Sequence, residues 1–199
     1  MGLVGLCVLG CAQAPRGAVR PRLGRTQALL VAGARDQLTW GTRYEPAYVK
    51  IAYPGGDPPR TQGVCTDVVV RAYRNAGFDL QKLIHEDMKA AWGAYPRYAD
   101  KKAPDSNIDH RRVPNQKAYF KRHALSLTLK CDSPKDWQPG DIVEWKLVNG
   151  RDHTGILTDK LDGDGYPYAI HNIGDGPQEE DVLRTWTWKI VGHFRYPRR

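Results

Sequence analysis

The hydrophobic pattern changes its period near the middle of the chain, and this change limits the folds that the sequence can adopt. Between Cys65 and Ala76 apolar residues recur at helical spacing, and Gly77 supplies a stop. After residue 140 the pattern becomes short runs of β-branched and aromatic residues separated by turn signals. Helices followed by strands predict an α+β domain in which N-terminal helices pack on an antiparallel β-sheet.

Further elements follow from the same patterns. Helices are predicted over residues 26–38 and 80–92, and a short helix is predicted from Pro114 towards Phe120. Residues 48–53 would alternate between two faces if they were extended. Residues 162–165 are predicted to form a hairpin turn rather than a calcium loop, because the remaining ligand positions of such a loop are missing. Strands are predicted at 141–145, 153–158, 168–173 and 189–196.

Length and charge bound the domain count and the partners. A chain of 199 residues with 41% hydrophobic content can bury one core, so residues 26–199 are predicted to form a single domain, and we expect a monomer. The formal charge of +8 favours anionic partners. The basic residues are scattered, however, without a dense run interleaved with aromatics, so nucleic-acid binding is not predicted.

The first 25 residues resemble an export segment followed by a linker. Residues 2–14 are apolar like the hydrophobic region of a secretion signal, but too few to span a bilayer. Residues 8–11 are similar to a lipoprotein cleavage box, which would place a lipid anchor on Cys11, whereas residues 12–14 fit ordinary cleavage. A tail without fixed structure is the alternative. The export interpretation predicts a periplasmic or cell-envelope location and leaves only Cys65 and Cys131 after processing.

Cys65 is the candidate nucleophile. It stands in the first turn of the predicted helix, where backbone N–H groups and the helix dipole favour an anion, so its thiolate is expected to form easily. Gly63 lets substrate approach closely. The alternative is that Cys65 is a small apolar residue on the core face of the helix.

A thiolate nucleophile requires a base and a group that orients it. His153 opens one predicted strand and His171 lies in the next, so a hairpin could place both on the face that packs against the Cys65 helix. Asn172 must then point to the opposite face. Tyr53 could donate a hydrogen bond to a developing oxyanion. The alternatives are two unrelated surface histidines and an ordinary packed tyrosine.

The charged segment Asn107–Arg112 has two interpretations. Its arginines could bind a substrate carboxylate, or the segment could be a structural ion-pair cluster. The histidines have no zinc-site spacing, so neither a metal nor a cofactor is predicted.

Several motifs in one order resemble known families. The chain resembles NlpC-type cell-wall peptidases in four short segments, which are residues 63–67, 139–143, 153–156 and 170–172. A bacterial family known as domain of unknown function 1287 is more similar still, over residues 28–196. Its marks are Tyr53-Pro54, the run Gly-Val-Cys-Thr-Asp, and residues 79–81, 107–112, 171–174 and 192–195.

The resemblance implies a papain-like, NlpC-type core with Cys65 as nucleophile, His153 as base, His171 as orienting residue and Tyr53 as oxyanion donor. It implies a cysteine peptidase or amidase that hydrolyses an amide bond in the peptide part of peptidoglycan. A thiol acyltransferase or thioesterase and a non-catalytic wall-binding module are the alternatives. The sequence departs from the usual NlpC pattern, reading Val-Cys-Thr-Asp in place of Asp-Cys-Ser-Gly. The candidate substrate-binding residues are Asp67, Asp109, His110, Arg111, Arg112 and Asn172.

Overall fold

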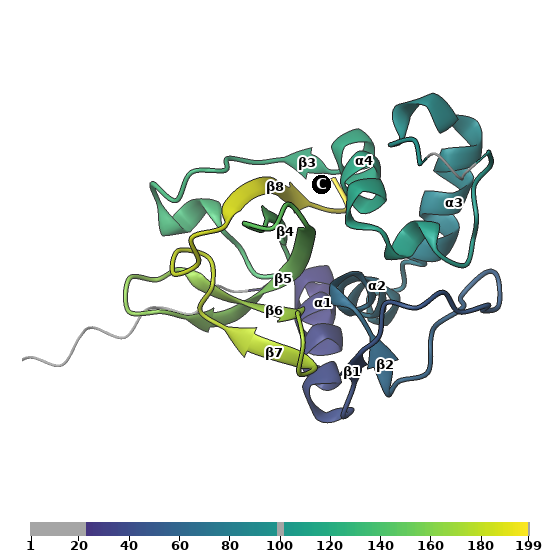
Figure 1. The fold of residues 1–199 in the computed structure, drawn as a ribbon. Helices are drawn as coiled ribbons and strands as arrows, with labels where there is room; N and C mark the ends of the chain where they lie inside the picture. Colours follow the sequence, from purple (N-terminus) through teal and green to yellow (C-terminus); the bar gives the residue numbers. More distant parts are fainter. Residues whose placement is uncertain (1–22, 99–101, 199) are drawn as a thin grey trace, which may run out of the picture.

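Helices and an antiparallel sheet form the two layers of the protein in a computed structural model, which describes residues 23–98 and 102–198. One six-stranded sheet has the order β3-β8-β4-β5-β6-β7, with helices beside it (Figure 1). This confirms the predicted α+β class, whereas the export segment and Cys11 lie outside the described residues.

The helices are α1 (Arg25–Asp36), α2 (Cys65–Asn75), α3 (Leu80–Ala90) and α4 (Val113–His123). The strands are β1 (Arg43–Tyr44), β2 (Gln62–Gly63), β3 (Leu125–Ser126), β4 (Ile142–Lys146), β5 (Asp152–Leu161), β6 (Pro167–Asn172), β7 (Pro177–Glu180) and β8 (Lys189–Arg195).

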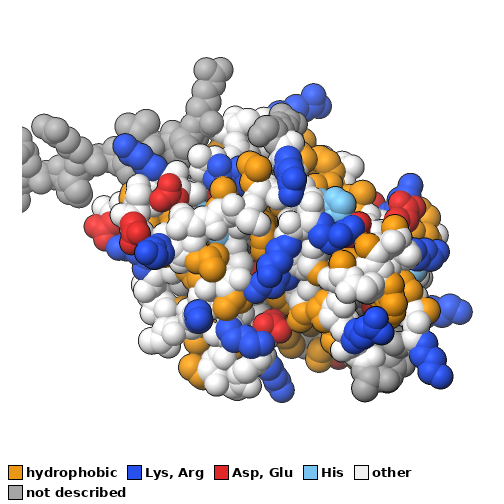
Figure 2. All heavy atoms as spheres, turned by 90° about the horizontal axis from the view of Figure 1, so that it is seen from above, with side chains coloured by type: hydrophobic (Ala, Val, Ile, Leu, Met, Phe, Trp, Pro, Cys, Tyr) orange, Lys and Arg blue, Asp and Glu red, His pale blue; other side chains and the backbone are white. Residues whose placement is uncertain are grey.

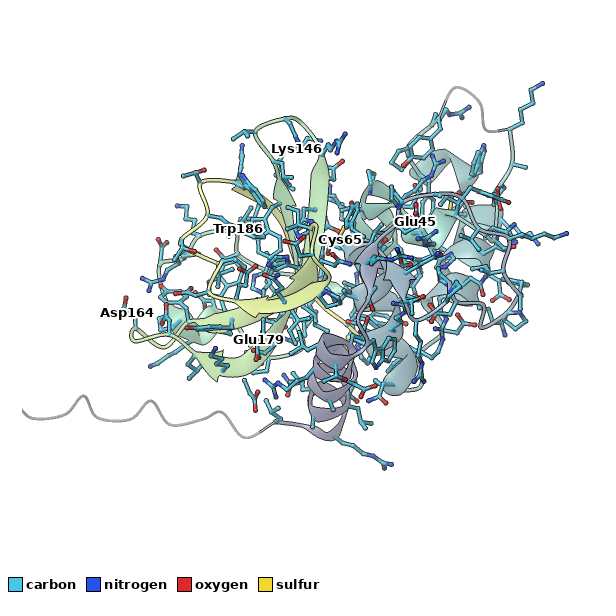
Figure 3. The ribbon with its side chains drawn as sticks, turned by 60° about the horizontal axis from the view of Figure 1, so that its bottom comes forward. Glu45, Cys65, Lys146, Asp164, Glu179 and Trp186 are labelled. Carbon is cyan, nitrogen blue, oxygen red and sulfur yellow. The ribbon has the colours of Figure 1, made fainter. Side chains whose placement is uncertain are left out.

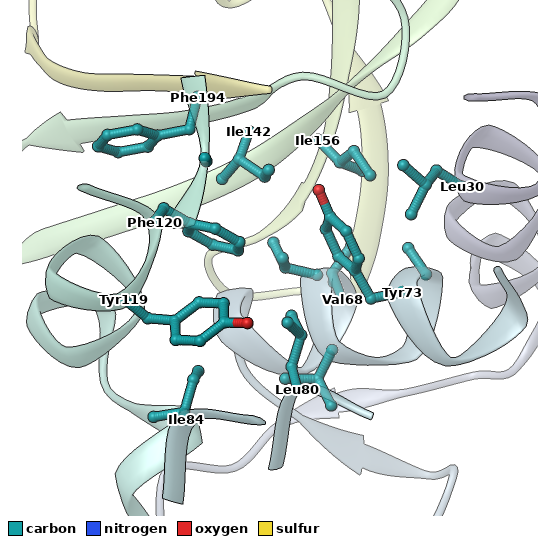
Figure 4. Packing of buried hydrophobic residues seen from close by; sticks show 14 of the residues in the cluster. Leu30, Val68, Tyr73, Leu80, Ile84, Tyr119, Phe120, Ile142, Ile156 and Phe194 are labelled. Carbon is teal, nitrogen blue, oxygen red and sulfur yellow. The ribbon is translucent and has the colours of Figure 1, made fainter. Parts of the chain in front are cut away.

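Helix α2 packs its apolar side on the sheet, as its sequence pattern predicts. Val68 and Val69 are at most 1% exposed and share a core cluster with Ile156 of β5 and Ile170 of β6 (Figure 4). Gly77 ends this segment at a φ of 87°, a conformation that glycine adopts without a steric penalty. Each such buried aliphatic side chain contributes about 1.5–3 kcal/mol. The helix that begins at Cys65 is therefore fixed firmly against β5 and β6.

The other face of the sheet carries a second core cluster. Alternation along a strand sends Trp145 and Leu157 to this face, whereas Ile142 and Ile156 point to the helices. Val182 and Leu183, from the segment between β7 and β8, cover the second cluster. The sheet is thus buried on both faces, which explains why its strands read as apolar runs rather than as strict alternations.

Two motifs noted in the sequence meet in one ion cluster on the neighbouring strands β4 and β8. Both carboxylate oxygens of Asp141 accept hydrogen bonds from Arg195, at 2.7 and 2.8 Å. One of these oxygens lies 3.0 Å from Nε2 of His193, whose ring stacks on Trp137 with centroids 3.9 Å apart. The Gly-Asp motif before β4 and the His-Phe-Arg motif in β8 therefore join neighbouring strands.

Residues 48–53 do not form a strand. They are irregular, and the N–H of Ile51 donates to Oδ1 of Asn107 at 2.9 Å rather than to a neighbouring strand. The parallel two-residue pair β1–β2 and the strand β7 were not predicted from the sequence. Short strands of this kind depend on tertiary partners, and periodicity does not identify them.

Glu144 is a carboxylate buried on the helix-facing side of β4. It is 0% exposed, neither oxygen has a hydrogen-bond partner among the described residues, and Nζ of Lys117 lies 3.7 Å away, too far for a hydrogen bond. Burial raises the pKa of Glu144 to about 8, although the nearby lysine opposes the shift. The folded protein therefore retains a proton on this side chain at pH values where the unfolded chain loses it.

We expect the Glu144→Gln variant to be more stable than the parent at high pH. The raised carboxyl pKa means that the stability contribution of Glu144 is complete below pH 4.5 and is lost as the pH rises through 8. At pH 9 the variant should gain roughly 2–4 kcal/mol, because it avoids burying a charge. Urea unfolding at pH 5 and pH 9 measures the difference. The Glu86→Gln control, at an exposed position, should show no such pH dependence, and an equal effect at both pH values would contradict the assignment.

Candidate active site

Cys65 begins helix α2 at the boundary between the sheet and the helices, with Trp186 on the sheet side and Glu45 on the helical side (Figure 3). The Asp67 carboxylate accepts from the N–H of Val64 at 2.7 Å and closes the first turn. Backbone N–H groups of Thr154, Thr66 and Cys65 itself lie near the sulfur and favour its thiolate. Because Thr154 belongs to β5, the thiol is held against that strand.

The thiol of Cys65 is protonated in the free protein. It is 5% exposed, and this burial raises its pKa to about 12, outweighing the backbone N–H groups that favour the thiolate. The expectation that the helix start makes the thiolate easy to form is therefore wrong for the free protein. Cys65 and Cys131 are both free thiols, as the nucleophile hypothesis requires of Cys65.

We expect iodoacetamide to alkylate Cys65 slowly at neutral pH. Cys131 is only half-buried, and peptide mapping should show that it reacts faster than Cys65 between pH 6 and pH 9. The rate at Cys65 should still be rising at pH 10, since the thiolate forms only near the raised pKa. A plateau of the rate at Cys65 near pH 6 or 7 would contradict this result and would indicate a thiolate–imidazolium pair.

His153 of β5 and His171 of β6 lie together, with ring centroids 5.1 Å apart. They leave the sheet on the face opposite the apolar side of α2, so the expectation that they face that helix is wrong. The reason is the alternation of the strands: Ile156 and Ile170 occupy the helix-facing positions. The histidine rings are packed instead among indoles, which are those of Trp145, Trp186 and Trp188.

Both imidazoles are neutral at pH 7. Burial lowers the pKa of His153 to about 3, with a further contribution from His171, and lowers the pKa of His171 to about 4. Oε2 of Glu180 lies 3.0 Å from Nε2 of His171 but is poorly aligned for a hydrogen bond. Glu180 was not singled out from the sequence, because its strand β7 was not predicted. The three side chains form a row across β5, β6 and β7, in the order His153, His171 and Glu180. Strand β5 also carries Thr154, whose N–H lies near the sulfur.

The structure does not bring Tyr53 to Cys65. Tyr53 is 41% exposed, and its ring packs edge-to-face on His85 of α3 at a centroid distance of 5.0 Å. Tyr44 and Tyr98 are the tyrosines that line the same hollow as the thiol, and burial, with a contribution from Cys65, raises the pKa of Tyr44. No sequence pattern indicates Tyr44, because its strand β1 has only two residues.

The candidate substrate-binding residues divide into two groups. Asp67 forms a buried ion pair with Arg111, at 2.8 and 3.0 Å. Asp109 and His110 are buried in the short helical turn before α4, and Nδ2 of Asn172 donates to the carbonyl of Gly63 at 3.2 Å. Burial lowers the pKa of His110 to about 4. Asp67, Asp109 and Asn172 bond to backbone groups around the site, and His110 is buried beside them, whereas the arginines at 111 and 112 reach the hollow.

A hollow of about 390 Å³ lies next to the sulfur. Its wall comes from the segment before α2, the start of α4 and the start of β5, which are far apart in the sequence. Lys and Arg side chains outnumber acidic ones on the face shown in Figure 2. The polar and reactive residues at the hollow are Tyr44, Cys65, Tyr98, Arg111, Arg112, Arg151 and Asp152.

Two absences hold for residues 23–98 and 102–198. No group of three or more His, Cys, Asp or Glu side chains there could hold a metal ion. No helix in this part of the chain is both long enough and apolar enough to cross a membrane.

The fold and site define an α+β domain with a free cysteine at a helix start, beside a basic hollow and a buried histidine pair. The family model described as "Domain of unknown function (DUF1287)" matches residues 31–196, and the chain belongs to this family. It is similar to "Uncharacterized protein YijF" of Escherichia coli (strain K12), with 51% identity over 171 residues, covering 86% of this chain and 82% of that protein.

Proposed function

We propose that this protein is an exported cysteine hydrolase with a papain-like core that cleaves an amide bond in the peptide part of peptidoglycan. The observation that carries the proposal is the position of the Cys65 sulfur, which lies at the start of α2, near backbone N–H groups that favour its thiolate and beside a hollow. Backbone N–H groups at such a position can hold a thiolate or a developing oxyanion. The order of the motifs and the apolar N-terminal residues support the cell-wall substrate and the export.

The reaction begins from a neutral pair. The Cys65 thiol gives its proton to His153 as the sulfur attacks the amide carbonyl, and the protonated imidazole then donates this proton to the leaving amine. A thioester on Cys65 results. Water, deprotonated by the same imidazole, hydrolyses the thioester, releases a carboxylic acid and restores the thiol. The His153 ring leaves β5 on the face opposite α2, so this step requires a water or a local rearrangement at the start of β5 to pass the proton between the Cys65 sulfur and the imidazole.

The other groups have supporting roles in this proposal. His171 and Glu180 continue the row behind His153 and would stabilise the imidazolium that forms during the reaction. Tyr44 takes the place that the sequence assigned to Tyr53, because its hydroxyl-bearing ring lines the hollow with the sulfur.

A non-catalytic wall-binding module is the second candidate. The raised pKa of the Cys65 thiol favours it, since an enzyme of this kind commonly holds a reactive thiolate in advance. The basic hollow would then bind an anionic polymer without cleaving it.

Digestion of purified sacculi distinguishes the candidates. Sacculi are incubated with the protein, and the released fragments and their new termini are identified by mass spectrometry. A hydrolase releases fragments with a new amine and a new carboxyl terminus, an acyltransferase leaves a modified acceptor, and a binding module sediments with the sacculi and releases nothing. Release of nothing under conditions where the protein binds would exclude the hydrolase.

A further inference from the structure

The arginine side chains at the hollow beside Cys65 differ in their partners. Arg111 is neutralised by its buried ion pair with Asp67 and also donates to backbone carbonyls. Arg112 and Arg151 have no carboxylate within ion-pair distance among residues 23–98 and 102–198. Two guanidinium groups of the hollow therefore keep their charge available for a ligand.

The acidic side chain of the hollow does not cancel these charges. Oδ1 of Asp152 lies 2.8 Å from Nζ of Lys146, so this carboxylate already has a cationic partner. The hollow, with Asp152 and Arg111 both paired, carries the net positive charge of Arg112 and Arg151. A planar carboxylate is the ligand that matches guanidinium groups in charge and geometry.

Both groups stand on segments that form the wall of the hollow beside Cys65. Arg112 is the N-cap residue of α4, and its guanidinium carbon lies 4.1 Å from the centre of the Tyr98 ring. This stacking restricts the side chain before a ligand arrives, which lowers the entropy cost of binding. Arg151 precedes β5 and is two residues before His153. A ligand held by both groups would therefore lie close to the proposed nucleophile.

We propose that Arg112 and Arg151 form a carboxylate-binding subsite beside Cys65, so that the substrate carries a free carboxylate close to the amide that is cleaved. This inference rests on the proposed hydrolase function and specifies its substrate. It excludes peptides whose carboxyl groups near the cleaved bond are blocked as amides.

The test compares two forms of one probe. Muropeptides released from sacculi by a muramidase are used either in their native form or with their carboxyl groups converted to methylamides. Binding is measured by calorimetry with the Cys65→Ala protein, which does not consume the probe under the proposed mechanism, and cleavage is measured with the parent. The Arg112→Gln and Arg151→Gln variants are compared with Lys189→Gln, which removes an exposed charge at the start of β8.

We expect the native probe to bind at least about tenfold more tightly than the methylamide, and each arginine variant to lose most of this preference. The Lys189→Gln variant should keep it. If the native probe binds more tightly than the methylamide but the parent cleaves neither, the hydrolase proposal is overturned and the carboxylate subsite stands. Equal binding of the two probes, or a preference that both arginine variants retain, would overturn the subsite whether or not cleavage occurs.

Discussion

Replacing Cys65 with alanine is expected to abolish the release of fragments from peptidoglycan, with a loss of at least about 1,000-fold in rate. The sulfur is the atom that forms the thioester in the proposed reaction, and alanine offers no nucleophilic atom at this position. Release of soluble fragments from sacculi, followed by chromatography, measures the rate.

The matched control for this change is Cys131→Ala. Cys131 is also a free thiol, but it packs against the second core cluster rather than at the hollow. This variant should keep nearly full activity. Both variants should unfold near the parent in urea, because each removes one small side chain. Undiminished release of fragments by the Cys65→Ala protein would contradict the nucleophile assignment.

The second large effect is expected on stability, from Asp67→Ala. Asp67 and Arg111 have side chains that are 1% and 2% exposed, so removing the carboxylate leaves a buried guanidinium without its counter-ion. Breaking a buried pair in this way costs about 3–5 kcal/mol. For a domain of this size the midpoint of thermal unfolding should fall by roughly 6–20 °C. Differential scanning calorimetry measures the shift.

Two further variants test the physical reason for this loss. The Asp67→Leu, Arg111→Met double variant removes both charges and should recover part of the lost stability. Glu86→Ala breaks the exposed pair with Lys82, in which the side chains are 51% and 54% exposed, and should change stability by less than about 1 kcal/mol. A double variant that is less stable than Asp67→Ala would show that packing, rather than the unpaired charge, dominates.

The neutral resting state of the site has a mechanistic consequence. The Cys65 thiol and the His153 imidazole are both uncharged at pH 7 because burial disfavours the charged form of each group. Proton transfer must therefore accompany substrate binding or the attack itself. A substrate carboxylate held by Arg112 and Arg151 would change the electrostatic potential beside the sulfur. In the proposal, substrate binding is therefore linked to the deprotonation of the Cys65 thiol.

The sequence predicted the parts of the fold that depend on local pattern. The helix from Cys65 to Gly77 has an apolar stripe at helical spacing, and the structure places α2 there. The pairing of His153 with His171 follows from a hairpin between neighbouring strands, and the structure confirms it. The prediction that the pair faces the Cys65 helix was wrong. Alternation along a strand shows which side chains share a face of the sheet, but it does not show which face a helix covers.

The rest of the site depends on contacts between distant segments. The pair of Asp67 and Arg111 joins residues 44 positions apart, and no local pattern distinguishes it from two surface charges. Tyr44 reaches the hollow on a two-residue strand that exists only because Gln62 and Gly63 pair with it. Tyr53 was proposed as an oxyanion donor from its position before Cys65 and from the family resemblance, but its ring packs on His85 of α3 instead.

Mapping a covalent intermediate tests the central claim most directly. The parent protein is mixed with native muropeptides, quenched with acid during turnover and digested for peptide mass spectrometry. We expect an acyl adduct on the peptide that contains Cys65, removable by hydroxylamine and missing from the Cys65→Ala protein. Turnover with the adduct on another residue, or turnover that continues in the Cys65→Ala protein, would contradict it.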